Sequence, residues 1–121
     1  MAIMTTELDD IKSVIMDKIV SDYSFVGFGT GTASALPSDT TLVAEVLRAA
    51  RQEYTETSSR VTISGYLNAA QSNSNTIGEV GAFTLISGGD MKIRNTYATP
   101  VVKTSDKEVW TDLTVTVGVT Q

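Results

Sequence analysis

Apolar residues near the start of the chain recur at spacings of three and four, and this pattern predicts a helix from about Thr6 to Val20. Such a stripe usually packs against the helix's own domain. A helix that packs against its copies around a symmetry axis, or against a neighbouring subunit, would carry the same stripe, so both interpretations stay open. The stripe consists of Leu8, Ile11, Ile15 and Ile19.

After this helix the hydrophobic period changes to two, which is typical of β-strands. The plainest alternation runs from Glu108 to Val119, where mainly valines occupy one face. A glycine-containing turn at Ser87–Asp90 is predicted to join two of the other strands into a hairpin. The remaining strands or extended segments are predicted at residues 23–29, 51–57, 60–67, 76–86, 91–96 and 99–103.

The stretch between the first two strands is predicted to contain a loop and a short helix. A proline fixes the backbone of a polar loop at residues 33–39. A helix over residues 40–50 would then carry Leu42 on its apolar face. Glu45 and Arg48, three residues apart, would lie on the same side of that helix and pair.

Together these elements predict an α+β fold that is mainly β. The expected architecture is an antiparallel sheet or sandwich of about six strands, with an N-terminal amphipathic helix and one short helix. A chain of 121 residues is long enough for one domain with a modest core. Within that domain, residues 1–22 are expected to form a helical arm and residues 23–121 a β-rich part.

Glycines occupy alternate positions at the end of the first predicted strand, at Gly27, Gly29 and Gly31. We expect the last two to adopt positive φ and to lead the chain out of the sheet. A dinucleotide site would need a helix to follow at once, and a phosphate-binding loop would need Gly-Lys-Ser/Thr, so neither is indicated. Gly78 and Gly81 interrupt a later strand and predict a β-bulge or a close backbone approach there.

Glu79 stands between these two glycines, in a strand that is otherwise apolar or small. A buried carboxylate needs a partner. Arg48 is one candidate, and Arg94 across the predicted hairpin is the other. We therefore expect Glu79 to be paired structurally and not to be catalytic. Asp39 and Glu45 could complete a glycosidase-like carboxylate pair with it, but nothing in the sequence brings the three together.

Composition narrows the possible functions. The chain has no cysteine and no histidine, which removes thiolate metal sites and the commonest general base. We therefore predict no enzyme activity, and no catalytic, cofactor or metal site. The net charge of −5, without a basic cluster, argues against nucleic-acid binding. No apolar run approaches the length of a membrane span, and acids stand where a secretion signal would carry lysines, so synthesis in the cytoplasm without a cleaved signal is expected.

Two patterns about thirty residues apart, read together, resemble the N-terminal domain of tailed-phage tail-collar fibres and related small virion proteins. The second pattern reads Ile77-Gly-Glu-Val-Gly-Ala-Phe83, followed by Gly88-Gly89, and Lys103 precedes the last strand in a similar place. The resemblance covers roughly residues 23–117. The first pattern consists of Gly27, Gly29, Gly31, Asp39, Thr41, Leu42, Glu45 and Arg48.

The resemblance implies a structural protein of the virion of a tailed virus, at the tail tip, collar or fibre attachment point. It also implies an oligomer, often a trimer, whose functional surface lies in contacts with its own copies and with other virion proteins; a host-surface glycan is a further candidate partner. Two alternatives stay open, a capsid decoration protein and a carbohydrate-binding β-sandwich module. The aromatic residues available for sugar stacking would be Tyr23, Tyr54, Tyr66, Tyr97 and Trp110.

Overall fold

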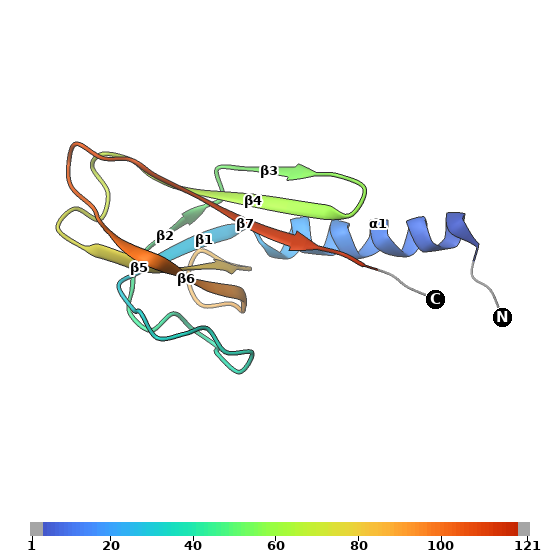
Figure 1. The fold of residues 1–121 in the computed structure, drawn as a ribbon, viewed down its shortest axis with the longest axis horizontal. Helices are drawn as coiled ribbons and strands as arrows, with labels where there is room; N and C mark the ends of the chain where they lie inside the picture. Colours follow the sequence, from blue (N-terminus) through green and yellow to red (C-terminus); the bar gives the residue numbers. More distant parts are fainter. Residues whose placement is uncertain (1–3, 119–121) are drawn as a thin grey trace.

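The computed structural model describes residues 4–118 and has an α+β fold that is mainly β, as the sequence predicts. Its strands form two antiparallel sheets, one of four strands in the order β2-β1-β5-β6 and one of three in the order β3-β4-β7 (Figure 1). The described part of the chain thus has seven strands where about six were expected. The elements are α1 (Thr5–Asp22), β1 (Phe25–Gly29), β2 (Glu45–Ala50), β3 (Glu53–Glu56), β4 (Arg60–Leu67), β5 (Thr76–Phe83), β6 (Met91–Val102) and β7 (Val109–Thr116).

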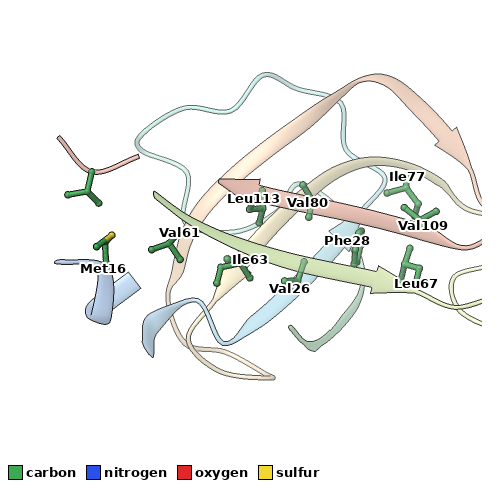
Figure 2. Close-up of a cluster of buried hydrophobic side chains, with 12 residues drawn as sticks. Met16, Val26, Phe28, Val61, Ile63, Leu67, Ile77, Val80, Val109 and Leu113 are labelled. Carbon is green, nitrogen blue, oxygen red and sulfur yellow. The ribbon is translucent and has the colours of Figure 1, made fainter. Parts of the chain in front are cut away.

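The hydrophobic core lies between the two sheets (Figure 2). Val26 and Phe28 on β1 meet side chains such as Ile63 on β4 and Leu113 on β7, and all four are at most 1% exposed. Gly65 on β4 lies directly over β1, where an added Cβ would stand 2.5 Å from a methyl group of Val26. The missing side chain therefore lets the sheets approach closely at this point.

Helix α1 packs on this core with its C-terminal half. Met16 is buried, Ile19 and Val20 pack against the core cluster, and the helix contacts β4. Of the predicted stripe only Ile19 takes part in this packing, and Ile15 is 40% exposed. No helix among the described residues is both long and apolar enough to cross a membrane.

The predicted helix over residues 40–50 is wrong. Residues 40–44 are irregular, and Glu45–Ala50 is strand β2, which pairs antiparallel with β1. Strand β1 lies in the middle of its sheet, and β2 completes its ladder on the side away from β5. The ladder satisfies backbone groups of both strands, and this outweighs the weak helix preference of a short segment.

The hairpin predicted at Ser87–Asp90 is present, and the strands predicted at 51–57 and 60–67 form another. β3 and β4 pair antiparallel, and β5 and β6 are joined through Gly88 and Gly89, whose φ angles are +66° and +70°. The two segments expected at 91–96 and 99–103 are one long strand, β6, which contains Pro100. Proline is tolerated because β6 lies at the edge of its sheet. β7 ends at Thr116, and Val119, the last residue of the predicted strand, lies outside the described residues.

Candidate functional site

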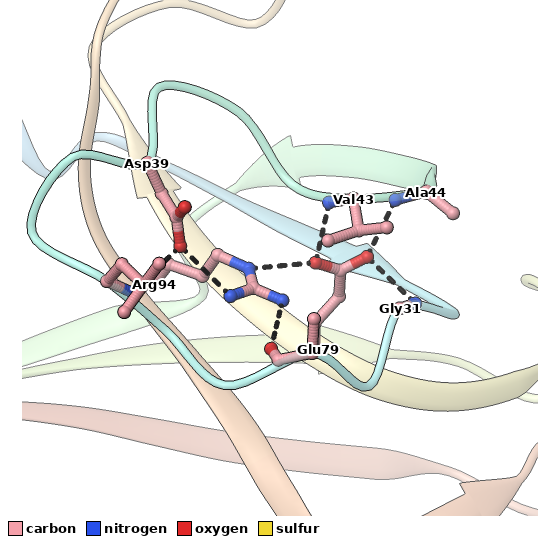
Figure 3. Close-up of polar contacts among 8 residues, drawn as sticks. Gly31, Asp39, Val43, Ala44, Glu79 and Arg94 are labelled. Carbon is pink, nitrogen blue, oxygen red and sulfur yellow. Dashed lines mark hydrogen bonds and ion pairs between the residues drawn. The ribbon is translucent and has the colours of Figure 1, made fainter.

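A buried polar network lies on the outer face of the four-stranded sheet, beneath the β1–β2 connection of residues 30–44 (Figure 3). Val26 and Phe28 point into the core, so the alternating glycines of β1 face the connection. An added Cβ at Gly29 would stand 2.7 Å from the carbonyl oxygen of Ala44, and one at Gly31 would stand 2.5 Å from a carboxylate oxygen of Glu79. Because these glycines have no side chain, the connection and the Glu79 carboxylate can pack directly against their backbone.

The expectation of positive φ at Gly29 and Gly31 is wrong. Among the described residues, positive-φ glycines occur only at Gly88 and Gly89, in the β5–β6 turn. The alternating glycines are needed for their lack of a side chain, not for backbone freedom.

Glu79 is the centre of the network, and it is fully buried on β5. The predicted irregularity lies just before it, since the register of β5 with β6 shifts between Ile77 and Glu79. One carboxylate oxygen, Oε2, accepts hydrogen bonds from the backbone N–H groups of Gly31 and Ala44, at 2.9 and 2.8 Å. The other, Oε1, accepts from the N–H of Val43 at 2.8 Å and from Nε of Arg94 at 3.0 Å.

These donors set the protonation state of Glu79. Burial alone raises its pKa, but the hydrogen bonds from Ala44, Val43, Arg94 and Gly31 together outweigh burial and lower the pKa below the ordinary value of 4.5. The carboxylate is therefore ionised at neutral pH. An ionised carboxylate offers about four acceptor positions, and all of them are occupied here.

Arg94 extends the network from the sheet into the loop. Besides Nε to Glu79, it donates from Nη1 to Asp39 Oδ2 at 3.1 Å and from Nη2 to the carbonyl of Ala33 at 2.7 Å. Asp39 in turn accepts a hydrogen bond from the backbone N–H of Leu36 at 2.9 Å. The prediction of a structural pair for Glu79 is confirmed, with Arg94 and not Arg48 as the partner, and the guanidinium also brings Asp39 into the same network.

Arg48 forms a second, neighbouring cluster. Its Nε and Nη2 donate to the two carboxylate oxygens of Glu45 at 2.7 and 2.8 Å, so the predicted pair is confirmed. Nη1 donates to the carbonyls of Leu85 and Gly88, and the guanidinium lies 3.5 Å from the ring centre of Phe83. Arg48 thereby ties β2 to the β5–β6 turn.

A bulge explains why residues three apart in a strand pair with each other. Phe28 lies opposite Leu47 while Gly29 lies opposite Glu45, so the register shifts by one residue within β2. The extra residue places Glu45 and Arg48 on the same face of the sheet. The connection adds an apolar contact there, because Leu42 is 5% exposed and packs over the bare backbone of β1 and β5. An added Cβ at Gly81 would stand 3.2 Å from Leu42 Cδ2.

The network can do little chemistry, because its hydrogen-bonding positions are already occupied within the protein. Glu79 has no acceptor position left for a substrate or a metal ion, and Glu45 is engaged with Arg48 outside the network. Within residues 4–118 no group of three or more acidic side chains is placed to hold a metal ion. Beside the network, a pocket of about 330 Å³ lies between the loop at Leu36–Asp39 and the start of β6. The arrangement serves to fix the connection on the sheet.

Two features of the structure were not foreseen. Lys103 is fully buried, and its ammonium donates to Asn73 Oδ1 at 2.8 Å and to the carbonyls of Thr104 and Ala69 at 3.0 and 3.4 Å, which closes the β4–β5 loop over it. Tyr66 and Trp110, far apart in sequence, form a cross-strand pair with ring centres 4.4 Å apart. The sequence signals were a lysine at the end of an extended apolar segment and an aromatic residue on each of two alternating strands.

The predicted assembly residues thus divide into two groups. Those of the sheet and its connection surround the network on one face of the four-stranded sheet. The helical residues lie on α1 and take no part in it; they are Leu8, Ile11, Ile15 and Ile19, of which Ile19 packs against the core. No protein-family model matches the chain, and a search of curated proteins finds no similar sequence.

Proposed function

We propose that the chain is a structural subunit of a tailed-virus particle, at the tail tip, collar or fibre attachment point, and that it works as an oligomer without catalysis. The observation that supports this best is the closed network around Glu79. Gly31 and Asp39 from the first collar-fibre-like pattern meet Glu79 from the second in that network. All acceptor positions of this carboxylate are used inside the protein. It therefore stabilises the conformation of the loop and has no acceptor position left for a substrate.

The network fixes the conformation of the β1–β2 connection, a loop that projects from the sheet. The β1–β2 connection extends away from both sheets (Figure 1) and presents exposed apolar side chains, with Leu36 at 60% and Val43 at 63%. Binding costs less when a contact loop is ordered beforehand. A fixed loop with apolar side chains on its surface therefore suits a permanent contact with another virion protein.

Mass spectrometry of purified particles tests the proposal, using a virus whose genome encodes this chain. The particles are dissociated and the tails are separated from the capsids. The proposal expects the chain in the tail fraction, in fixed stoichiometry to the other tail proteins. Recovery with the capsid shell would support the decoration protein instead, and absence from particles that are made while the chain is abundant in the infected cell would overturn both.

A second candidate, the carbohydrate-binding module, is favoured by the Tyr66–Trp110 pair. Trp110 is 54% exposed, and Ser64 and Asp112 lie next to the pair on the same face of β4 and β7, joined by a 2.7 Å hydrogen bond. An aromatic ring beside polar groups is a usual place for a sugar to stack. Titration with oligosaccharides of glucose, galactose and N-acetylglucosamine tests this. Binding that is lost in Trp110→Ala and kept in Tyr54→Ala would support it, and no binding by the unaltered protein would exclude it for these sugars.

A further inference from the structure

Helix α1 carries two separate apolar faces. The face that packs on the core consists of Met16, Ile19 and Val20. The second runs from the N-cap residue to just past the middle of the helix, at spacings of four, three and four, and does not belong to the core cluster. At about 100° per residue, the centres of the two faces are roughly a quarter-turn apart around the helix axis. The second face consists of Met4, Leu8, Ile11 and Ile15.

This second face is only partly covered, since Leu8 and Ile11 are half-buried. Met4 is 62% exposed, Ile15 is 40% exposed, and the neighbouring Val14 is 69% exposed. The N-terminal turns of α1 extend beyond the ends of the strands (Figure 1), so neither sheet covers them. A hollow of about 260 Å³ lies on this surface, lined by Ile11, Val14 and Ile15 together with two acids. A helix of this length would be only marginally stable in isolation. The C-terminal half of α1 is anchored on β4, so the N-terminal half is held in an ordered conformation and presents its apolar surface.

We infer that this face binds the same face of two further copies of the chain, in a parallel three-helix bundle. The spacing is that of a heptad repeat, in which Leu8 and Ile15 take the a positions and Ile11 the d position, while the N-cap residue Met4 lies seven residues before Ile11. Isoleucine at d disfavours a parallel dimer, and isoleucine at both a and d favours three or more strands. Val14 takes the g position beside Ile15, which widens the apolar seam in the same direction. The helical segment that carries this face, residues 5–15, is roughly 16 Å long.

The charges beside the seam fit copies that run parallel. In a parallel bundle, a g residue faces the e residue five positions later in the neighbouring helix. Glu7 takes a g position and Lys12 the following e position, so the negative side chain of each copy meets the positive side chain of the next. Among the ion pairs formed by the described residues, neither Glu7 nor Lys12 takes part in one within the chain. Both remain available between copies.

This inference deepens the proposed function, since it names the element through which the subunits meet. The test is the molar mass of the full chain in solution, by light scattering and sedimentation equilibrium up to ~100 μM protein. The unaltered chain is expected to reach three times the 12.9 kDa mass of one copy. Ile11→Asp with Ile15→Asp is expected to be monomeric, with an unchanged circular dichroism spectrum. Ser13→Asp, on the outer side of the same helix, is the matched control and should stay trimeric.

The outcomes separate the two proposals. A trimer that persists in the Ile11→Asp, Ile15→Asp variant with the fold intact would overturn the helix bundle and leave an oligomeric virion subunit standing. A monomer for the unaltered chain would overturn the bundle and the oligomeric part of the proposed function together. If the double variant does not fold, Ile11→Ser supplies the same comparison with a smaller change.

Orientation is tested by charge reversal. Glu7→Lys places two positive side chains opposite each other in a parallel bundle and is expected to weaken association several-fold. Adding Lys12→Glu restores opposite charges and is expected to return the dissociation constant to within about threefold of the original. No effect of Glu7→Lys, or no recovery in the double variant, would contradict the parallel arrangement.

Discussion

Glu79→Gln replaces one oxygen of the buried carboxylate by an amide NH₂ group of nearly the same shape. The amide oxygen can still accept two hydrogen bonds, but its nitrogen faces donors on the other side, whichever way the side chain is turned. Either the N–H groups of Gly31 and Ala44, or those of Val43 and Arg94, then lose their acceptor. The guanidinium also loses its buried counter-charge.

The expected cost follows from these losses. A buried donor left without an acceptor costs about 1–3 kcal/mol, and removing one partner of a buried ion pair costs about 3–5 kcal/mol in total. The two overlap in the same groups, so the expected loss in the free energy of unfolding is about 3–5 kcal/mol. A domain of this size is stable by only about 5–15 kcal/mol. The melting temperature should therefore fall by roughly 10–20 °C.

Urea unfolding followed by circular dichroism measures the effect. It is best done in the Ile11→Asp, Ile15→Asp background, since association of copies would make the apparent stability depend on concentration. Glu53→Gln, at an exposed position on β3, is the matched control and should change the stability by less than about 0.5 kcal/mol. A Glu79→Gln variant within about 1 kcal/mol of its parent would refute the view that this network holds the connection on the sheet.

Three further predictions concern pH, the glycines and the buried lysine. Because the pKa of Glu79 is lowered in the folded protein, the stability that its ionised carboxylate contributes is fully present above the ordinary value of 4.5 and is lost as the pH falls through the lower folded value. The free energy of unfolding of Glu79→Gln should therefore depend less on pH below 4.5 than that of the unaltered protein. Parallel acid-unfolding curves for the two proteins would contradict this. Gly29→Ala should destabilise by about 2–4 kcal/mol in thermal unfolding, because its Cβ meets the Ala44 carbonyl, whereas Gly118→Ala, with nothing within 4 Å, should be neutral; equal effects would contradict the packing argument. Lys103→Met should cost about 1–3 kcal/mol and speed hydrogen exchange in the β4–β5 loop, and the exposed Lys107→Met should do neither; a silent Lys103→Met would contradict a role in closing that loop.

The regular strands could be predicted from the sequence because each has one face toward the core. Along β7, Val109 and Leu113 are buried while Trp110 and Asp112 are exposed, and this alternation is visible in the residues themselves. The hairpin turn was also predictable, because Gly88 and Gly89 adopt positive φ, which glycine adopts without strain.

Strand β2 could not be predicted for a specific physical reason. Its bulge adds one residue to the alternation, so that Glu45 and Arg48 face the same side although they are three apart. On a helix, residues three apart also share a side. A bulged strand therefore reproduces the spacing of a helical pair, and only the partner strand β1 distinguishes the two. Nothing local in the sequence carries that information.

The alternating glycines and Glu79 form one structural unit. Neither the glycine pattern of residues 27–31 nor the pattern around Glu79 indicates this unit by itself. A buried carboxylate without a metal ion needs about four donors, and side chains rarely supply that many in one place. Backbone N–H groups can supply them if two segments of main chain come within hydrogen-bonding distance of the same oxygens. Gly29 and Gly31 permit this approach, because a Cβ at either position would overlap the carboxylate. The network consequently lies on the outer face of the sheet, where loop backbone is available, and the core between the sheets remains largely apolar. The conformation of the projecting connection thus depends on the ionised state of one buried carboxylate.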